Sequence, residues 1–188
     1  KISLVVLLGV FAFTGLTQAT TYYIATNGSD SNSCATAQNI NTPKRSIGSG
    51  AGCLKSGDTL YIRAGIYNES LEGNIPAGTS WSSPVTLKAY PNETVILRPN
   101  GTQRVMQFQD GQQYIVIDGL ILDGANVAVN VVKITYNSSP SAAANHIRIK
   151  NSELKNSPFS QAVSISEGSN YNELIGNKVY NIGPDHTD

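Results

Sequence analysis

Three segments in the second half of the chain repeat one another, and this repeat constrains the fold more than any other feature. The segments that align without gaps are residues 114–124 (YIVIDGLILDG), 146–156 (HIRIKNSELKN) and 171–181 (YNELIGNKVYN), which begin 32 and then 25 residues apart. Each segment holds two short strands around a corner of Gly or Asn, residue types that tolerate a positive φ. A repeat of this length that is built from short strands is typical of a solenoid, whose units bury their apolar faces only against their neighbours.

The same alignment predicts the register of the solenoid. Apolar side chains at equivalent places should stack from turn to turn, and asparagines at a repeated corner should form a hydrogen-bonded ladder. A third apolar strand follows each of the first two units, at residues 131–134 and 162–165. The pattern predicts an all-β parallel β-helix, whereas the rival β-sandwich leaves the repeat unexplained and would need more hairpin signals. The predicted stacks are Ile117, Ile149 and Leu174, and Leu122, Leu154 and Val179.

Composition excludes several classes of protein. The 13 basic residues balance 13 acidic ones and only 14% of all residues are charged, which argues against a nucleic-acid binder that uses a general basic field. A hydrophobic content of 40% is enough to build a core, so an intrinsically disordered chain is excluded as well. Residues 39–54 are the one candidate for a helix after the N-terminal segment, and their three glycines make them a poor one.

The first 19 residues have the pattern of a secretory signal peptide. Lys1 precedes an apolar run that reaches Leu16, and the small residues that a signal peptidase reads end at Ala19. The alternative is an uncleaved membrane anchor, but a spanning helix needs roughly 20 apolar residues. We therefore expect residues 1–19 to be removed. Residues 20–188 would then belong to a single secreted domain, located in the extracellular space, the periplasm or at the cell surface, without a membrane segment.

Cysteines and glycosylation sequons agree with secretion. Cys34 and Cys53 predict one disulfide, because an even number of cysteines behind a signal peptide favours a bridge and no C-x-x-C spacing points to a metal or redox pair. Five N-x-S/T sequons would carry glycans on surface turns in a eukaryotic host and would mean little in a bacterium. The sequons begin at Asn27, Asn68, Asn92, Asn100 and Asn137.

Three sequence blocks resemble the secreted right-handed parallel β-helix superfamily, which includes pectate lyases, other polysaccharide lyases and some adhesins. The blocks are residues 57–69 (GDTLYIRAGIYNE), 84–97 (PVTLKAYPNETVIL) and 114–126 (YIVIDGLILDGAN), and the likeness covers most of 22–181. The resemblance implies the fold and leaves the chemistry open, because many activities share this scaffold. A β-helix that ended at residue 188 would leave its last turn uncapped, so we expect the N-terminal part of one β-helix domain, incomplete at the C-terminus.

The resemblance also implies a chemistry. Polysaccharide lyases of this superfamily remove a proton beside a uronate carboxyl with a Lys or Arg base, often with bound calcium, which prefers oxygen ligands. The alternative for the acidic and basic candidates of the repeat is a set of cross-strand ion pairs, each worth about 0–1 kcal/mol. In that alternative Asp118 lies over Lys150 and Asp123 over Lys155, and the polar run 185–188 is a plain turn. The candidate catalytic residues are Lys150, Lys155 and His186, and the candidate calcium ligands are Asp118, Asp123, Asp185 and Asp188.

Two classes of function follow from these patterns. The preferred interpretation is a secreted, carbohydrate-active lyase or hydrolase that acts on an acidic polysaccharide, since the long parallel face offers a groove to an extended chain. The alternative is a non-catalytic extracellular β-helix, either an adhesin or a polysaccharide-binding module; a structural solenoid in front of a separate catalytic domain comes third. Several acidic residues beside a Lys or Arg on adjacent turns would favour the enzyme, whereas Asn, Ser and Thr ladders without them would favour binding. Either protein would be a monomer whose partner is a polysaccharide.

Overall fold

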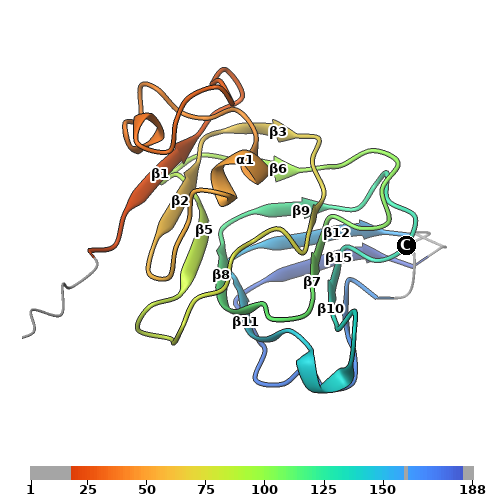
Figure 1. Ribbon diagram of the computed structural model, residues 1–188. Helices are drawn as coiled ribbons and strands as arrows, with labels where there is room; N and C mark the ends of the chain where they lie inside the picture. Colours follow the sequence, from red (N-terminus) through yellow and green to blue (C-terminus); the bar gives the residue numbers. More distant parts are fainter. Residues whose placement is uncertain (1–17, 159–160, 184–188) are drawn as a thin grey trace, which may run out of the picture.

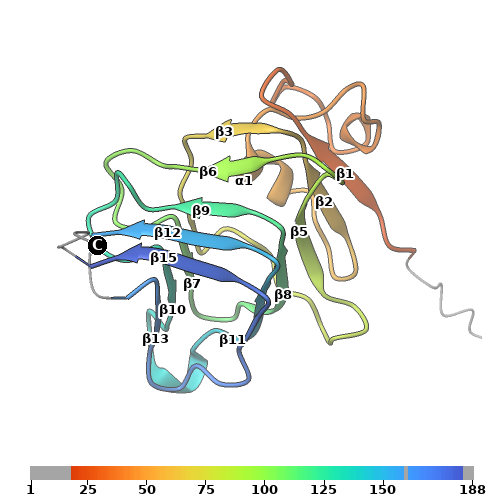
Figure 2. The same ribbon diagram turned by 180° about the vertical axis from the view of Figure 1, so that it is seen from behind.

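The backbone coils through three parallel β-sheets, as the computed structural model in Figure 1 shows. The structure describes residues 18–158 and 161–183. Each full turn of the coil adds one strand to sheet A, one to sheet B and one to sheet C, so that strands of successive turns lie side by side. Figure 2, seen from behind, presents the strands of sheet B in order from β3 (Gly65–Tyr67) to β15 (Lys178–Ile182).

Short strands make up all three sheets. Sheet A consists of β1 (Thr21–Ile24), β2 (Thr59–Ile62), β5 (Val85–Ala89), β8 (Gln113–Asp118), β11 (Asn145–Lys150) and β14 (Glu173–Ile175). Sheet B consists of β3 (Gly65–Tyr67), β6 (Val95–Leu97), β9 (Ile121–Asp123), β12 (Glu153–Ser157) and β15 (Lys178–Ile182). Sheet C consists of β4 (Leu71–Glu72), β7 (Met106–Phe108), β10 (Val132–Ile134) and β13 (Val163–Ile165).

The pairing between these strands is parallel throughout, and its register is the one that the repeat predicts. Both predicted stacks form, because their members are direct partners in neighbouring strands of sheets A and B. In sheet C, Val132 and Val163 of the two predicted third strands are likewise partners. The prediction of a right-handed parallel β-helix is confirmed. A β-sandwich is excluded, because it pairs its strands in antiparallel fashion.

Alternate side chains of each strand point into the coil and form one continuous core. Leu87 and Ile117 follow each other in sheet A, Phe108 enters from sheet C, and all three are fully buried. Burial of a side chain of this size contributes about 1.5–3 kcal/mol. The last described turn differs, since Leu174 and Val179 continue the core stacks but are 50% and 55% exposed.

The short corners of the coil use residues in the left-handed region. Between sheets A and B, Gly119 and Asn151 occupy equivalent places with φ of 73° and 50°. At the next corner, the Nδ2 of Asn156 donates to Asp123 at 2.7 Å, and the Nδ2 of Asn181 donates to the Oδ1 of Asn156 at 3.1 Å. The predicted ladder is therefore present, and it explains why Gly and Asn recur at these positions.

The segment between β1 and β2 covers the core at the first turns. It contains a 3₁₀ helix (Thr36–Gln38) and α1 (Ile47–Ala51), the short helix that lies within the poor helix candidate 39–54. The side chain of Ser46 caps α1 by accepting from the backbone of Ser49, and the apolar residues at both ends of α1 are fully buried. A second 3₁₀ helix (Pro140–Ala142) lies in the loop between β10 and β11.

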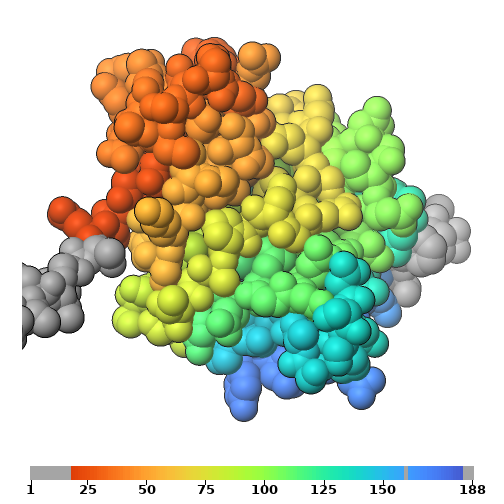
Figure 3. All heavy atoms as spheres, viewed as in Figure 1, coloured from red at the N-terminus to blue at the C-terminus, as the bar shows by residue number. Residues whose placement is uncertain are grey.

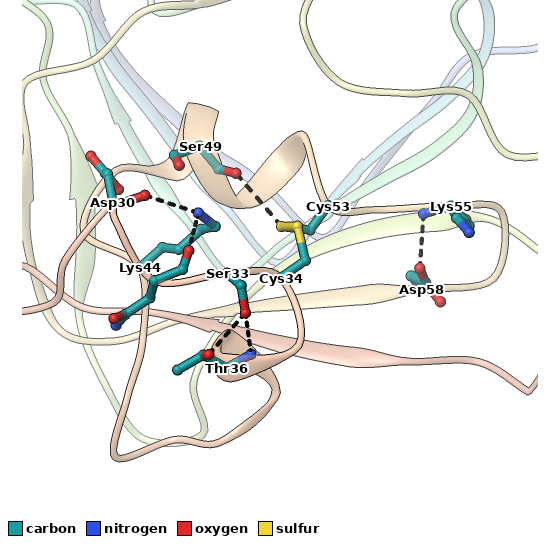
Figure 4. Close-up of a disulfide and its surroundings, with 10 residues drawn as sticks. Asp30, Ser33, Cys34, Thr36, Lys44, Ser49, Cys53, Lys55 and Asp58 are labelled. Carbon is teal, nitrogen blue, oxygen red and sulfur yellow. Dashed lines mark hydrogen bonds between the residues drawn. A yellow bond between two sulfur atoms is a disulfide. The ribbon is translucent and has the colours of Figure 1, made fainter.

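The predicted disulfide ties this covering segment together. Cys34 and Cys53 are bonded, with 5.5 Å between their Cα atoms, and Figure 4 shows the bridge beside α1. In the same loop the ammonium of the buried Lys44 donates to the backbone oxygens of Asp30 and Asn32 at 3.1 and 2.5 Å. These carbonyl groups replace part of the hydration of the ammonium, which is what burial of a charge requires.

The structure bears only in part on the predicted signal peptide, membrane segment and sequons. The predicted signal peptide covers residues 1–19, of which 1–17 lie outside the described residues, so its cleavage stays a prediction. Within the described ranges, no helix is long and apolar enough to cross a membrane. All five sequon asparagines are exposed and lie between strands, which is where a glycan can be attached without disturbing a sheet.

Candidate functional site

The outer face of sheet C carries a column of polar side chains. The register places Glu72 of β4 beside Gln107 of β7, followed by Lys133 of β10 and Ser164 of β13. Strands in such a sheet are about 4.8 Å apart, so the four side chains form a continuous row. Sheet C lies on the near side of the molecule in Figure 1, and Figure 3 shows its successive turns crossing this surface from yellow through green to teal.

Arg104, which precedes β7, lies beside this column in a fixed orientation. Its Nε donates to the Oδ1 of the buried Asn130 at 2.8 Å, and its Nη1 donates to the Oε1 of Gln107 at 3.2 Å. The amide of Gln107 in turn donates to the Oε1 of Gln109 at 3.0 Å. Because these bonds connect two successive turns, the guanidinium is held in place before any ligand arrives.

The charges on this face suit an anionic ligand. Neither Arg104 nor Lys133 forms an ion pair with another described residue. The carboxylate of Glu72, at the end of the column, accepts a hydrogen bond from the Oγ of Ser70 at 2.8 Å. A guanidinium binds a carboxylate through two parallel hydrogen bonds, and an ammonium adds a point charge. The column can therefore hold carboxylates that are spaced along an extended chain, with an amine close to them.

The sequence candidates Asp118 and Lys150 lie elsewhere, on the outer face of sheet A. The side chain of Asp118 is 9% exposed, and its Oδ2 lies 3.4 Å from the Nζ of Lys88 and 3.4 Å from the Nζ of Lys150. Burial alone would raise the pKa of Asp118. The hydrogen bond from Asn151 and the two ammonium groups outweigh burial and lower that pKa, so the carboxylate is ionised and neutralised by its neighbours.

Asp123 and Lys155 form a second cluster, at the end of sheet B. The Asp123 side chain is 1% exposed and accepts from Arg98 at 2.7 and 2.8 Å, while the Nζ of Lys155 lies 3.9 Å away. Burial would raise the pKa of Asp123, but hydrogen bonds from Asn156, Ala125 and Arg98 lower it. Both predicted ion pairs are thus present, on two different sheets, and the structure does not bring the four candidates into one site.

The described residues do not fit a calcium ion. Calcium takes six to eight oxygen ligands, and no group of three or more Asp, Glu, His or Cys side chains in the described part of the chain could hold a metal. Asp118 and Asp123 are occupied by cations instead. The remaining candidates Asp185, His186 and Asp188 lie outside the described residues, so their roles stay predictions.

Sequence reasoning missed Arg104, Lys133 and Glu72. Lys133 had a visible signal, because it is the single charged residue of the strand 131–134 and strand alternation turns it away from the core. Arg104 had none, since its place depends on Asn130, which is 26 residues further along the chain and belongs to the next turn. The two loops that hold these residues, 98–105 and 124–131, differ in sequence, so the repeat does not predict the contact between them.

Comparison with known proteins confirms the fold. No protein-family model and no curated protein sequence matches the chain. The crystal structure of pectate lyase Pel9A superposes with a TM-score of 0.65 at 16% identity over 89% of this chain, and a structure of XylC with xylose with 0.54 at 10% over 87%. A rhamnogalacturonan lyase gives 0.50 at 15% over 86%. The chain covers 42%, 54% and 52% of these three proteins, about half of their length. The chain therefore has the right-handed parallel β-helix fold, similar to that of pectate lyase Pel9A.

Proposed function

We propose that the protein binds an acidic polysaccharide along the outer face of sheet C and cleaves it by elimination. The observation that carries this proposal is the pair of cations, Arg104 and Lys133, which have no carboxylate partner among the described residues and lie beside a row of polar side chains. The similarity in fold to pectate lyase Pel9A and to a rhamnogalacturonan lyase supports this substrate class. The disulfide supports action outside the reducing cytosol.

In the proposed reaction, Arg104 holds the carboxylate of a uronate residue and stabilises the negative charge that develops on it. Lys133 first gives its ammonium proton to solvent and then takes the proton from the carbon next to that carboxylate. The electron pair of the broken C–H bond forms a carbon–carbon double bond, the glycosidic C–O bond breaks, and the departing oxygen receives a proton from solvent. Gln107 and Ser164, the neighbours of Lys133 in the column, would hydrogen-bond the sugar hydroxyls.

The test follows ultraviolet absorbance of the unsaturated ends that an elimination creates. Pectate, alginate and glycosaminoglycans are offered to the purified protein with calcium and with a chelator. We expect a rise in absorbance with at least one of them, and its loss in Lys133→Met. The matched control is Lys178→Met, which removes an ammonium whose side chain is 76% exposed on sheet B. No rise with any substrate, or full activity of Lys133→Met, would refute the proposed elimination.

A non-catalytic module that binds acidic polysaccharide is the second candidate. Two observations favour it: the hydrogen-bonded Asp–Asn–Asn ladder at the corner after sheet B, and the engagement of Asp118 and Asp123 in ion pairs. Such a module would bind galacturonate oligosaccharides, as measured by affinity chromatography or calorimetry, without any change in ultraviolet absorbance. Loss of that binding in Arg104→Met would assign it to the outer face of sheet C.

A further inference from the structure

A strip of aromatic rings runs along the edge of sheet A where each of its later strands begins. The same place in three successive turns is taken by Tyr114, His146 and Tyr171. Trp81, in the loop before β5, contacts the first two of these rings. The ring centroids of Tyr114 and His146 are 4.4 Å apart and those of His146 and Tyr171 are 4.9 Å apart, both stacked. Trp81 meets Tyr114 edge-on at 5.4 Å and His146 at 6.0 Å. We call these four side chains the aromatic strip.

The backbone of the strip is unusual. Tyr114, His146 and Tyr171 have φ of 50°, 52° and 56°, in the left-handed region where a side chain with a Cβ costs free energy. Every other residue with positive φ in the described part of the chain is Gly or Asn, the residue types that occupy this region at least cost. Three aromatic side chains are therefore placed where the backbone alone would favour Gly or Asn, which points to a role for the rings themselves.

Three of the four rings keep their polar tips free, whereas the Nδ1 of His146 is hydrogen-bonded to the Oδ1 of Asn145. The hydroxyls of Tyr114 and Tyr171 and the Nε1 of Trp81 have no hydrogen-bond partner among the described residues, and none of these atoms is buried. Tyr171 is 75% exposed, and Trp81, Tyr114 and His146 are half-buried. An exposed aromatic side chain with an unused polar group combines an apolar contact surface with a hydrogen-bonding group, as at recognition surfaces.

The charge beside the strip is balanced. The guanidinium of Arg148 lies 3.9 Å from the ring centroid of Trp81, and it is tied to Glu173 by bonds of 2.8 and 3.0 Å. Glu173 thus neutralises Arg148, in contrast to the two cations without carboxylate partners on sheet C. An acidic ligand finds no free cation in this pair, whereas a neutral ligand with apolar faces and hydroxyl groups matches the surface.

From these observations we infer that the aromatic strip is a second carbohydrate-binding site, which takes neutral pyranose chains. It lies on sheet A, at the start of β8 and β11 and two residues before β14, whereas the cationic face is the outer side of sheet C. Three stacked rings from successive turns about 4.8 Å apart, with Trp81 beside the first two, give a contact length that a short oligosaccharide can span. The ring faces within the stack cover one another, so the pyranose rings would pack across the outer edges of the aromatic strip, and their hydroxyls would bond the free tips. The inference does not depend on the proposed elimination.

The chain provides its own reporter, because Trp81 is its one tryptophan. The purified protein is titrated with β-1,4-linked cellohexaose and xylohexaose, and with hexagalacturonate as the acidic counterpart, while tryptophan fluorescence is followed. We expect a saturable change with a neutral hexasaccharide. Asn is suited to positive φ, so the variants Tyr171→Asn and His146→Asn should remain folded. Each should weaken binding roughly three- to tenfold.

The matched control is Tyr180→Asn, which removes a tyrosine from the same last turn but from sheet B, and it should bind like the unaltered protein. Thermal denaturation of each variant separates loss of binding from loss of fold. If neither neutral hexasaccharide causes a saturable change in fluorescence, the inference is overturned. A response to hexagalacturonate alone, or neutral binding that either strip variant leaves unchanged, overturns it as well.

Discussion

Replacement of Asp123 by Asn tests how the buried ion pair at the end of sheet B stabilises the coil. In the folded protein the Asp123 carboxylate accepts two bonds from Arg98, one from Asn156 and one from the backbone of Ala125, at 2.7 to 3.1 Å. Asp123→Asn keeps the size of the side chain but turns an amide donor toward the guanidinium. Arg98 then loses its carboxylate partner.

The magnitude follows from burial. Removal of one partner from a buried ion pair costs about 3–5 kcal/mol. The Arg98 side chain is 35% exposed, so water replaces part of the lost interaction. We therefore expect the free energy of unfolding to fall by about 2–3 kcal/mol. For a domain of this size that loss lowers the melting temperature by roughly 4–12 °C.

The assay is urea and thermal denaturation at neutral pH, followed by circular dichroism. The matched control is Glu167→Gln, which makes the same change at an exposed carboxylate without a hydrogen bond or ion pair among the described residues. Its free energy of unfolding should stay within about 0.5 kcal/mol of the unaltered protein. A loss below about 0.5 kcal/mol in Asp123→Asn would refute the reasoning, because the pair would then contribute no more than a surface contact.

The pH dependence of this difference has a definite sign. The pKa of Asp123 is lowered in the folded state from its ordinary 3.8, so the unfolded chain takes up the proton first as the pH falls. The stabilisation is complete well above pH 3.8 and is lost as the pH falls through the lowered pKa of the folded protein. The stability difference between the two proteins should thus be constant near neutral pH and shrink only in acid.

Three further predictions concern the disulfide, the core and the sequons. Cys34→Ser should lower the free energy of unfolding by about 3 kcal/mol, as read from urea denaturation, and reductant should then cause no further loss. Leu122→Ala, at a fully buried position of the core, should cost about 2–5 kcal/mol, and a loss below 1 kcal/mol would mean that the turns can collapse around the cavity. After secretion from a eukaryotic host, the intact mass should fall on treatment with an N-glycan-removing enzyme, because all five sequon asparagines are exposed; an unchanged mass would contradict this.

Much of the fold was predictable because its rules are local and repeat along the chain. Alternation with a period of two determines which side chain of a strand points inward, and the repeat places Ile117 over Ile149 without any knowledge of the structure. The ion pair of Asp118 with Lys150 and the ladder at Asn156 follow from the same register. The bridge between Cys34 and Cys53 followed from their being the two cysteines of a chain with a predicted signal peptide.

The candidate sites were less predictable, because they depend on loops that do not repeat. Arg104 reaches Asn130 because the loops 98–105 and 124–131, which differ in sequence, bring equivalent places of two successive turns side by side. The left-handed backbone of Tyr114 and His146 has no signal in residue type, since aromatic residues rarely adopt it. Nor does the position of Trp81 in sequence show that it meets both rings.

The amino-acid sequence by itself therefore determined the solenoid, the register of its turns and the disulfide. Each of these follows from a periodic pattern or from a count of residues. Only the tertiary structure decided which charges remain without an ion-pair partner on sheet C and which rings form a strip on sheet A. Both depend on contacts between turns that are 25 or more residues apart, and chain folding brings such residues together through packing of the whole coil rather than through any local preference.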